Sequence, residues 1–351
     1  MMNVGSVYPV KKNVQQMRLQ SKFLFYCGRG AEMFTDTDSE LNQWLEMLRS
    51  PSLSDRLVAV KSLQHLGEDA AVDALIIALT DESTAVQKIA VSALWEIANP
   101  IAIPTLLKTL ASPDEDVRTE ALSALGELIN ADDLLLLLDA LNQENINLQI
   151  NILILLRKIH DVQSLPAVLS FFNSQYPELR EAAITTLRYL NQVQICPPAL
   201  SLINDPDENV RRATALTLGH LADPEIVELL TQSLISDPDW QVRRNAAKSL
   251  AIHAKPEAIS ALKIALKDEN WQVRKFTLQV LQKTPDKDLL LDLIQALTDE
   301  YSDVRKEAAI ALANLENTDA LNALQQALDD PDRDVCIYAE RAIKKIQNLS
   351  S

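Results

Sequence analysis

The residue types that most often carry catalysis or bind metals are few and dispersed in this sequence. It holds four histidines, His65, His160, His220 and His253, and three cysteines, Cys27, Cys196 and Cys336. There is no C-x-x-C pair, no glycine-rich phosphate loop and no G-x-S-x-G nucleophile motif. The pattern therefore predicts no catalytic residue and no metal site, and it favours a binding protein over an enzyme.

Aromatic and basic residues instead recur at matching places near the C-terminus. The stretch "DPDWQVRRNAAKSL" (237–250) returns 31 residues later as "KDENWQVRKFTLQVL" (267–281), with a tryptophan at the same place. Mixtures of Trp, Tyr and Arg are typical of protein-binding surfaces. The alternative is that each ring only covers its neighbouring turn. The predicted partner-binding edge consists of Trp240, Trp271, Tyr301, Phe276, Tyr338, Arg244, Lys275 and Lys306, with Asn245 and Lys248 in the same groove.

A second unusual stretch is "NLQINILILL" (147–156), in which Ile150 and Ile154 occupy positions that are polar in other parts of the chain. An exposed apolar patch there would dock a partner helix or a hydrophobic ligand. Alternatively, the proline pair Pro197-Pro198 bends the array and covers both isoleucines. The sequence leaves these two interpretations open.

These residues belong to a repeat that runs through nearly the whole chain. Equivalent residues, here called position 0 of repeats one to ten, follow one another at intervals of 31 residues, with one interval of 32. A fixed period of this length is the signature of a repeat array. The ten residues at position 0 are Asp55, Val86, Val117, Leu148, Leu179, Val210, Val242, Val273, Val304 and Val335.

Each repeat is predicted to form two helices, the second of which begins near position 0. Apolar residues at positions 0, +4, +5 and +8 make a helical stripe, and position +4 is alanine in seven repeats. Positions +2, +3 and +6 are expected to face a concave groove. An aspartate five residues before position 0 and an arginine at position +1 recur in most repeats. Stacking of the repeats is expected to align them as an Asp–Arg ladder.

These helix pairs share the sequence pattern D-P-x-x-x-V-R-x-x-A-x-x-A-L. They resemble HEAT repeats, and more narrowly the short HEAT-like repeats named after the phycobilisome lyases of cyanobacteria. The resemblance covers about residues 38–347 and implies an all-α solenoid (superhelix) of about ten 31-residue helix pairs. It further implies an alternative function as a subunit of a bilin lyase, or as a factor in phycobilisome assembly or degradation. Groove Arg and Lys would then pair with the propionates of a transient bilin such as phycocyanobilin, and Trp271, Phe276 or Tyr338 would stack on its rings. A phycobiliprotein or a second HEAT-like subunit would be the protein partner.

Composition restricts the partners and the location. A formal net charge of −16 disfavours nucleic acid, and no apolar run is long enough to span a bilayer. The odd, scattered cysteines favour a reducing compartment, so we expect a cytoplasmic protein without a bound cofactor.

The ends of the chain depart from the repeat. We interpret residues 1–37 as a disordered arm, or as an upstream mis-called start, because Met33 directly precedes the first repeat. Residues 38–351 are expected to form a single solenoid, in which Cys336 and Glu340 mark the tenth repeat as a cap. The function that the sequence favours is an interaction scaffold that binds a partner protein in its concave groove.

Overall fold

The structure is a computed structural model that describes residues 34–67 and 69–349. These residues form 20 α-helices and ten short 3-10 helices, and no strand is found among them. The α-helices alternate as first and second helices of ten consecutive pairs, which confirms the predicted α-solenoid. Residues 1–33 of the expected arm, with the start proposed at Met33, lie outside the described residues, and helix α2 begins at Phe34.

The second helices begin at the polar turns that the sequence marks. Asn145, Asp207, Asp239 and Asn270 cap the helices that follow them, because each side-chain oxygen accepts a backbone N–H of the first turn. The second helices are α3 (Leu53–Leu66), α5 (Thr84–Ile97), α7 (Glu115–Leu128), α9 (Ile146–Ile159), α11 (Pro177–Leu187), α13 (Glu208–Leu218), α15 (Trp240–His253), α17 (Trp271–Leu281), α19 (Ser302–Leu315) and α21 (Arg333–Leu349).

The first helices are mostly shorter, and a 3-10 turn leads into many of them. In repeat six the first helix begins with Pro197-Pro198 and has only four residues. The first helices are α2 (Phe34–Leu48), α4 (Val72–Ala78), α6 (Ile103–Thr109), α8 (Leu134–Ala140), α10 (Leu165–Ser170), α12 (Pro197–Leu200), α14 (Ile226–Ser236), α16 (Ile259–Ala265), α18 (Leu290–Ala296) and α20 (Leu321–Gln326).

The core is the apolar seam between stacked pairs. The residue at position +4 has no solvent exposure in any repeat, whether it is alanine, Ile152, Thr214 or Thr277. Small side chains at this position allow neighbouring second helices to approach closely, as α15 approaches both α13 and α17. In repeat ten Ala339 is still buried while Glu340 is exposed. The burial pattern confirms the seam that the sequence predicts, and the cap at repeat ten stays a prediction.

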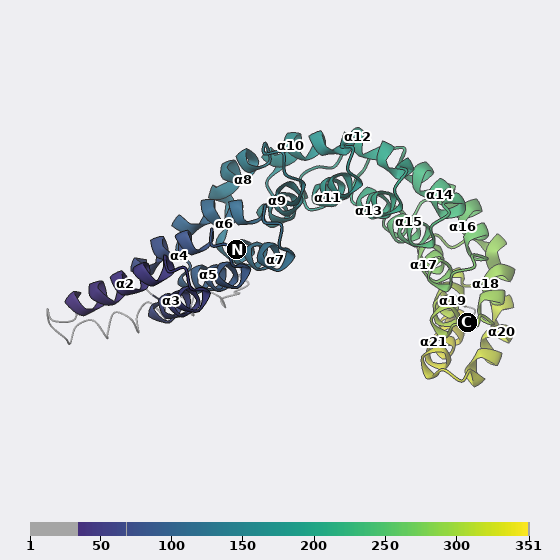
Figure 1. Cartoon of the computed structure of the whole chain (residues 1–351). Helices are drawn as coiled ribbons and strands as arrows, with labels where there is room; N and C mark the ends of the chain where they lie inside the picture. Colours follow the sequence, from purple (N-terminus) through teal and green to yellow (C-terminus); the bar gives the residue numbers. More distant parts are fainter. Residues whose placement is uncertain (1–33, 68, 350–351) are drawn as a thin grey trace, which may run out of the picture. The chain divides into compact units, whose positions relative to one another are not determined.

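Contacts between the helices divide the chain into two units, and the division falls in the sequence between Leu128 and Ile129. In the N-terminal unit α3, α5 and α7 pack in succession. In the C-terminal unit the second helices from α9 to α21 lie along the inner side of its curve, and the first helices from α8 to α20 lie outside them (Figure 1). None of the helices between residues 34 and 349 has the length and apolar character needed to cross a bilayer.

Candidate functional site

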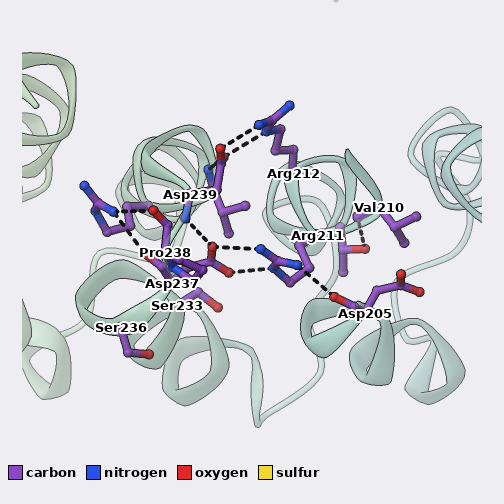
Figure 2. Close-up of polar contacts among 12 residues, drawn as sticks. Asp205, Val210, Arg211, Arg212, Ser233, Ser236, Asp237, Pro238 and Asp239 are labelled. Atoms are coloured by element: carbon purple, nitrogen blue, oxygen red, sulfur yellow. Dashed lines mark hydrogen bonds and ion pairs between the residues drawn. The ribbon is translucent and has the colours of Figure 1, made fainter. Parts of the chain in front are cut away.

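A ladder of arginines and aspartates fixes the turns from which the candidate residues project. In repeat six, Arg211 donates from Nε and Nη2 to both carboxylate oxygens of Asp237 in the next repeat, at 2.8 and 3.2 Å. Its Nη1 donates to the backbone carbonyl of Asp205, at 2.9 Å, in its own repeat (Figure 2). One guanidinium therefore ties two consecutive turns together through charge-assisted hydrogen bonds.

Six such pairs, here called the rungs of the ladder, share this geometry. Their Nε–Oδ2 distances are 2.6–2.8 Å, and the aspartate always comes from the following repeat, 25 or 26 residues on. The predicted ladder is thus confirmed. Its rungs are Arg56–Asp81, Arg180–Asp205, Arg211–Asp237, Arg243–Asp268, Arg274–Asp299 and Arg305–Asp330.

The two tryptophans leave these turns directly, because each is the first residue of its helix. Trp240 begins α15 and Trp271 begins α17. The Trp271 ring stacks on Tyr301 of the next repeat, with 5.2 Å between ring centroids and an interplanar angle of 13°. The guanidinium of Arg274, itself part of a rung, lies 6.0 Å from the centre of the Tyr301 ring. The stacked rings of Trp271 and Tyr301 are therefore connected to the ladder through Arg274.

A cation lies over each of the five rings in the candidate set. One helical turn after each tryptophan, Arg244 lies 5.3 Å from the centre of the Trp240 ring and Lys275 lies 5.8 Å from that of Trp271. Across the repeat boundary, Lys248 of α15 lies 4.5 Å from the ring centre of Phe276 on α17. These distances are those of cation–π contacts.

The basic residues differ in whether a carboxylate neutralises them. Lys275 and Lys306 share the single carboxylate of Asp303, at 3.2 and 3.1 Å. Among the described residues, Arg244 donates hydrogen bonds to the neutral amide oxygens of Gln272 and Asn245, and Asp239 acts on it through its charge without forming an ion pair. Burial, together with the nearby charges of Arg244 and Lys275, lowers the pKa of Lys248. Among these side chains of α15, α17 and α19, there are thus four cations (Arg244, Lys248, Lys275 and Lys306) and the one carboxylate of Asp303, which pairs with the last two.

The remaining predicted residues lie in different settings. Tyr338 is half-buried in repeat ten under Arg341, whose guanidinium lies 5.1 Å from the ring centre. Asn245 does not face a groove as expected for position +3: it is 3% exposed, and its amide donates to the backbone carbonyl of Arg212. Glu307, at position +3 of repeat nine, is buried as well. Adjacent second helices pack against each other at this position, so it is only partly a surface position.

Ile150 and Ile154 lie on α9, three repeats before the aromatic edge, and both side chains are half-buried. Neither isoleucine is fully covered, and neither is fully open. The docking patch therefore stays a prediction.

Sequence reasoning missed three features of this surface. Arg341 covers Tyr338, and the i, i+3 spacing of the two residues was a usable signal. Arg212 pairs with Asp239, the residue that caps α15, at 2.6 Å. In the N-terminal unit, Trp95 is about half exposed beside a shallow depression of about 520 Å³ that Glu120 and Glu127 also line.

The histidines and cysteines of the described chain lie in structural settings. His160 ends α9 with a left-handed backbone, and its Nδ1 is 2.8 Å from the Tyr189 carbonyl oxygen. Burial and the charge of Arg188 lower the pKa of His220. Cys336 takes the ladder position of repeat ten, and its Sγ lies 3.1 Å from the Asp330 carbonyl oxygen. Among residues 34–67 and 69–349, no three His, Cys, Asp or Glu side chains are grouped to hold a metal.

This architecture is shared with known proteins. The family model for HEAT repeats matches residues 41–126, 196–269 and 261–344, so the chain belongs to the HEAT-repeat family. No curated protein matches the sequence.

Two solved structures are similar in fold. The crystal structure of an engineered protein is 22% identical, with a TM-score of 0.53 over 88% of this chain and 99% of that one. A chain from the structure describing Kap95p binding to RanGDP is 14% identical, with a TM-score of 0.61. That alignment covers 97% of this chain but only 54% of the other, so this chain spans about half of its length.

Proposed function

We propose that this protein is an interaction scaffold that binds a partner protein on the second-helix surface of repeats seven to ten. The observation that carries the proposal is the alternation of rings and cations on the neighbouring second helices α15 and α17, from Trp240 and Arg244 to Trp271 and Lys275. In protein–protein interfaces, the residues that contribute most to the binding energy are often Trp, Tyr and Arg. The fold supports the same conclusion, because HEAT solenoids commonly bind protein partners.

The experiment is affinity capture of partners by the full chain, immobilised through a terminal tag. The test variant carries Trp240→Ala and Trp271→Ala. The matched control is Trp95→Ala, which removes an exposed tryptophan of the N-terminal unit. Circular dichroism verifies that all three proteins keep their helix content. We expect the test variant to lose at least 90% of a specific partner that the wild type and the control retain. Equal capture by all three would refute the role of this surface.

The partner classes that the sequence resemblance implies are a phycobiliprotein and a second HEAT-like subunit. Both can be added in purified form to the same capture assay. If Ile150 and Ile154 belong to the docking surface, Ile150→Ser with Ile154→Ser should weaken capture as well.

A second candidate function is a subunit of a bilin lyase. The observation that favours it is the position of Arg244 and Lys248 beside Trp240 and Phe276, since these cations could pair with bilin propionates while the rings stack on the tetrapyrrole. Its test is titration with phycocyanobilin, followed by absorbance and fluorescence. The spectrum should change with the wild type, and the change should weaken with Trp271→Ala. An unchanged wild-type spectrum would rule this candidate out and leave the scaffold proposal standing.

A further inference from the structure

The surface of repeats seven to nine holds more cations than it neutralises. Arg244 and Lys248 project one helical turn apart from α15, and Lys275 and Lys306 project from α17 and α19. Within the described chain, Asp303 is the carboxylate that pairs with this group, and it serves Lys275 and Lys306 together. Like charges one turn apart destabilise a helix slightly, so α15 itself gains nothing from having both Arg244 and Lys248. Their contacts are with the rings of Trp240 and Phe276 and with neutral amides.

This local excess is opposite in sign to the whole protein, whose formal net charge is −16. Elsewhere in the C-terminal unit the arginines at position +1 are neutralised in rungs, and Arg212 is paired with Asp239. The basic group is therefore a feature of one surface and not of the average composition. Burial and neighbouring cations lower the pKa of Lys248, so an anion at this place would relieve mutual repulsion.

The spacing of the cations suits an extended peptide. Adjacent second helices pack about 8–10 Å apart, so successive cations at position +2, Arg244 and Lys275, project at about that interval. An extended chain in the polyproline II conformation has three residues per turn and rises about 3.1 Å per residue, so side chains at every third residue point the same way and lie about 9 Å apart. Carboxylates at every third residue would therefore face successive cations. The rings of Trp240, Trp271 and Phe276 lie beside the cations and can receive apolar side chains between those carboxylates.

From this arrangement we infer that the partner binds through an acidic, extended segment, with its carboxylates on Arg244, Lys248 and Lys275 and its apolar side chains on the neighbouring rings. This inference rests on the proposed scaffold function and specifies the chemistry of its partner. Nucleic acid fits less well, because its backbone carries a charge at every nucleotide, whereas Asp303 and Asp239 stand among these cations and leave places for anionic groups only at intervals.

The experiment measures fluorescence anisotropy of the full chain with labelled 13-residue peptides. The acidic probe has glutamate at every third position and leucine and serine between them, and the second probe replaces each glutamate by glutamine. A single-stranded oligothymidylate of the same length is the third probe. The protein variants are Arg244→Gln, Lys248→Gln and both together. Lys255→Gln is the control, because it removes one exposed positive charge just beyond α15.

We expect the acidic peptide to bind at least tenfold more tightly than the glutamine peptide, which is about 1.4 kcal/mol. Each single variant should weaken acidic binding about three- to tenfold, the control should leave it unchanged, and 0.5 M salt should reduce it strongly. The comparison between peptides uses the wild-type protein, so it decides the question even where a variant folds poorly.

Three outcomes would overturn the inference. They are equal binding of the acidic and glutamine peptides, equal binding of the acidic peptide by the double variant and the control, and preference for the oligothymidylate. The first two leave the scaffold function standing if partner capture still depends on Trp240 and Trp271. If partner capture does not depend on Trp240 and Trp271 while the acidic peptide still binds selectively, the scaffold proposal is refuted and the anion-binding site remains supported.

Discussion

The rung between Arg243 and Asp268 offers a direct test of how the array is held together. Arg243 donates to both oxygens of Asp268, at 2.7 and 3.1 Å, and to the backbone carbonyl of Asp237 at 3.0 Å. Both side chains are about nine-tenths buried. The chain contains a natural replacement for this pair, since Gln87 and Gln149 take the place of the arginine, and Ser112 and Ser174 stand where the aspartate would be.

The expected decrease in the free energy of unfolding depends on which of the two charges is left without a partner. Asp268→Ser leaves a buried guanidinium bonded to backbone carbonyls and to the exposed Glu269, and we expect a loss of about 2–4 kcal/mol, toward the lower end for broken buried pairs. Arg243→Gln can retain the carbonyl bond, as Gln87 does to the Asp81 carbonyl at 2.6 Å. It leaves Asp268 with the N–H of Asn270, so we expect a loss of about 1–3 kcal/mol.

The double variant Arg243→Gln with Asp268→Ser removes both charges and gives the uncharged residue combination that the chain has at Gln149 and Ser174. It should therefore be more stable than the sum of the single variants predicts, with a coupling energy of about 1–3 kcal/mol. The assay is a double-mutant cycle from urea unfolding followed by circular dichroism. Thermal midpoints of the C-terminal unit should fall by about 2–4 °C for each kcal/mol.

A matched control removes an exposed ion pair of the same unit, the i, i+4 pair of Glu340 and Lys344, by Lys344→Gln. This variant should change the free energy of unfolding by less than about 1 kcal/mol. A coupling energy near zero, or an Asp268→Ser variant as stable as this control, would refute the reasoning that the ladder holds neighbouring turns together.

Three further predictions follow from individual contacts. The hydrogen bonds from Arg305 and Arg212 lower the pKa of Asp330 and Asp239, respectively. A carboxylate with a folded pKa below its unfolded value of about 3.9 contributes stability that is fully present above that value and is lost as the pH falls through the folded pKa. Thermal midpoints should therefore be flat above about pH 5 and drop below about pH 4, with a shallower drop for Arg305→Gln; an equal drop would contradict the assignment. At Gly219 an added Cβ would lie 2.6 Å from Ser249 Oγ and 2.9 Å from its Cβ, so Gly219→Ala should cost about 1–3 kcal/mol in urea unfolding. Adding Ser249→Gly should recover part of that loss, and a neutral Gly219→Ala would show that α13 and α15 are less closely packed than described. Ala98 ends α5 with φ of 57°, so Ala98→Gly should raise the thermal midpoint by relieving about 1 kcal/mol of left-handed strain, whereas Ala93→Gly within α5 should lower it. A lower midpoint for Ala98→Gly would contradict this explanation.

The buried seam was predictable because equivalent residues are buried against equivalent neighbours in every repeat. A residue such as Ala246 or Val273 contacts equivalent neighbours at each layer, so its type recurs at a fixed interval and the period reveals its role. The ladder was predictable for the same reason. The structure adds that each arginine pairs with the aspartate of the following repeat and also bonds to the turn of its own repeat.

The surface could be predicted only in part, because its contacts cross repeats and depend on side-chain rotamers. The candidate residues Trp271 and Tyr301 are 30 positions apart in the sequence, and their stacking follows from how two turns are aligned. The contact of Lys248 with Phe276 links positions +6 and +3 of adjacent repeats, which no spacing rule pairs. The prediction that Asn245, at position +3, faces the groove is wrong, because its side chain packs between two second helices. The sequence period alone cannot distinguish a residue that faces a groove from one that contacts the neighbouring helix.

The ladder and the candidate surface are connected, and this connection bears on affinity. Arg274 bonds to Asp299 in the ladder and also lies over the Tyr301 ring, which in turn stacks on Trp271. A partner that binds these rings meets side chains already held by buried ion pairs, so it loses less conformational entropy than on a mobile surface. A substitution in the ladder should therefore weaken binding without touching the partner. Arg274→Gln should do so through disorder of Tyr301 and Trp271, whereas Arg305→Gln, the next rung along, should affect stability with less effect on binding.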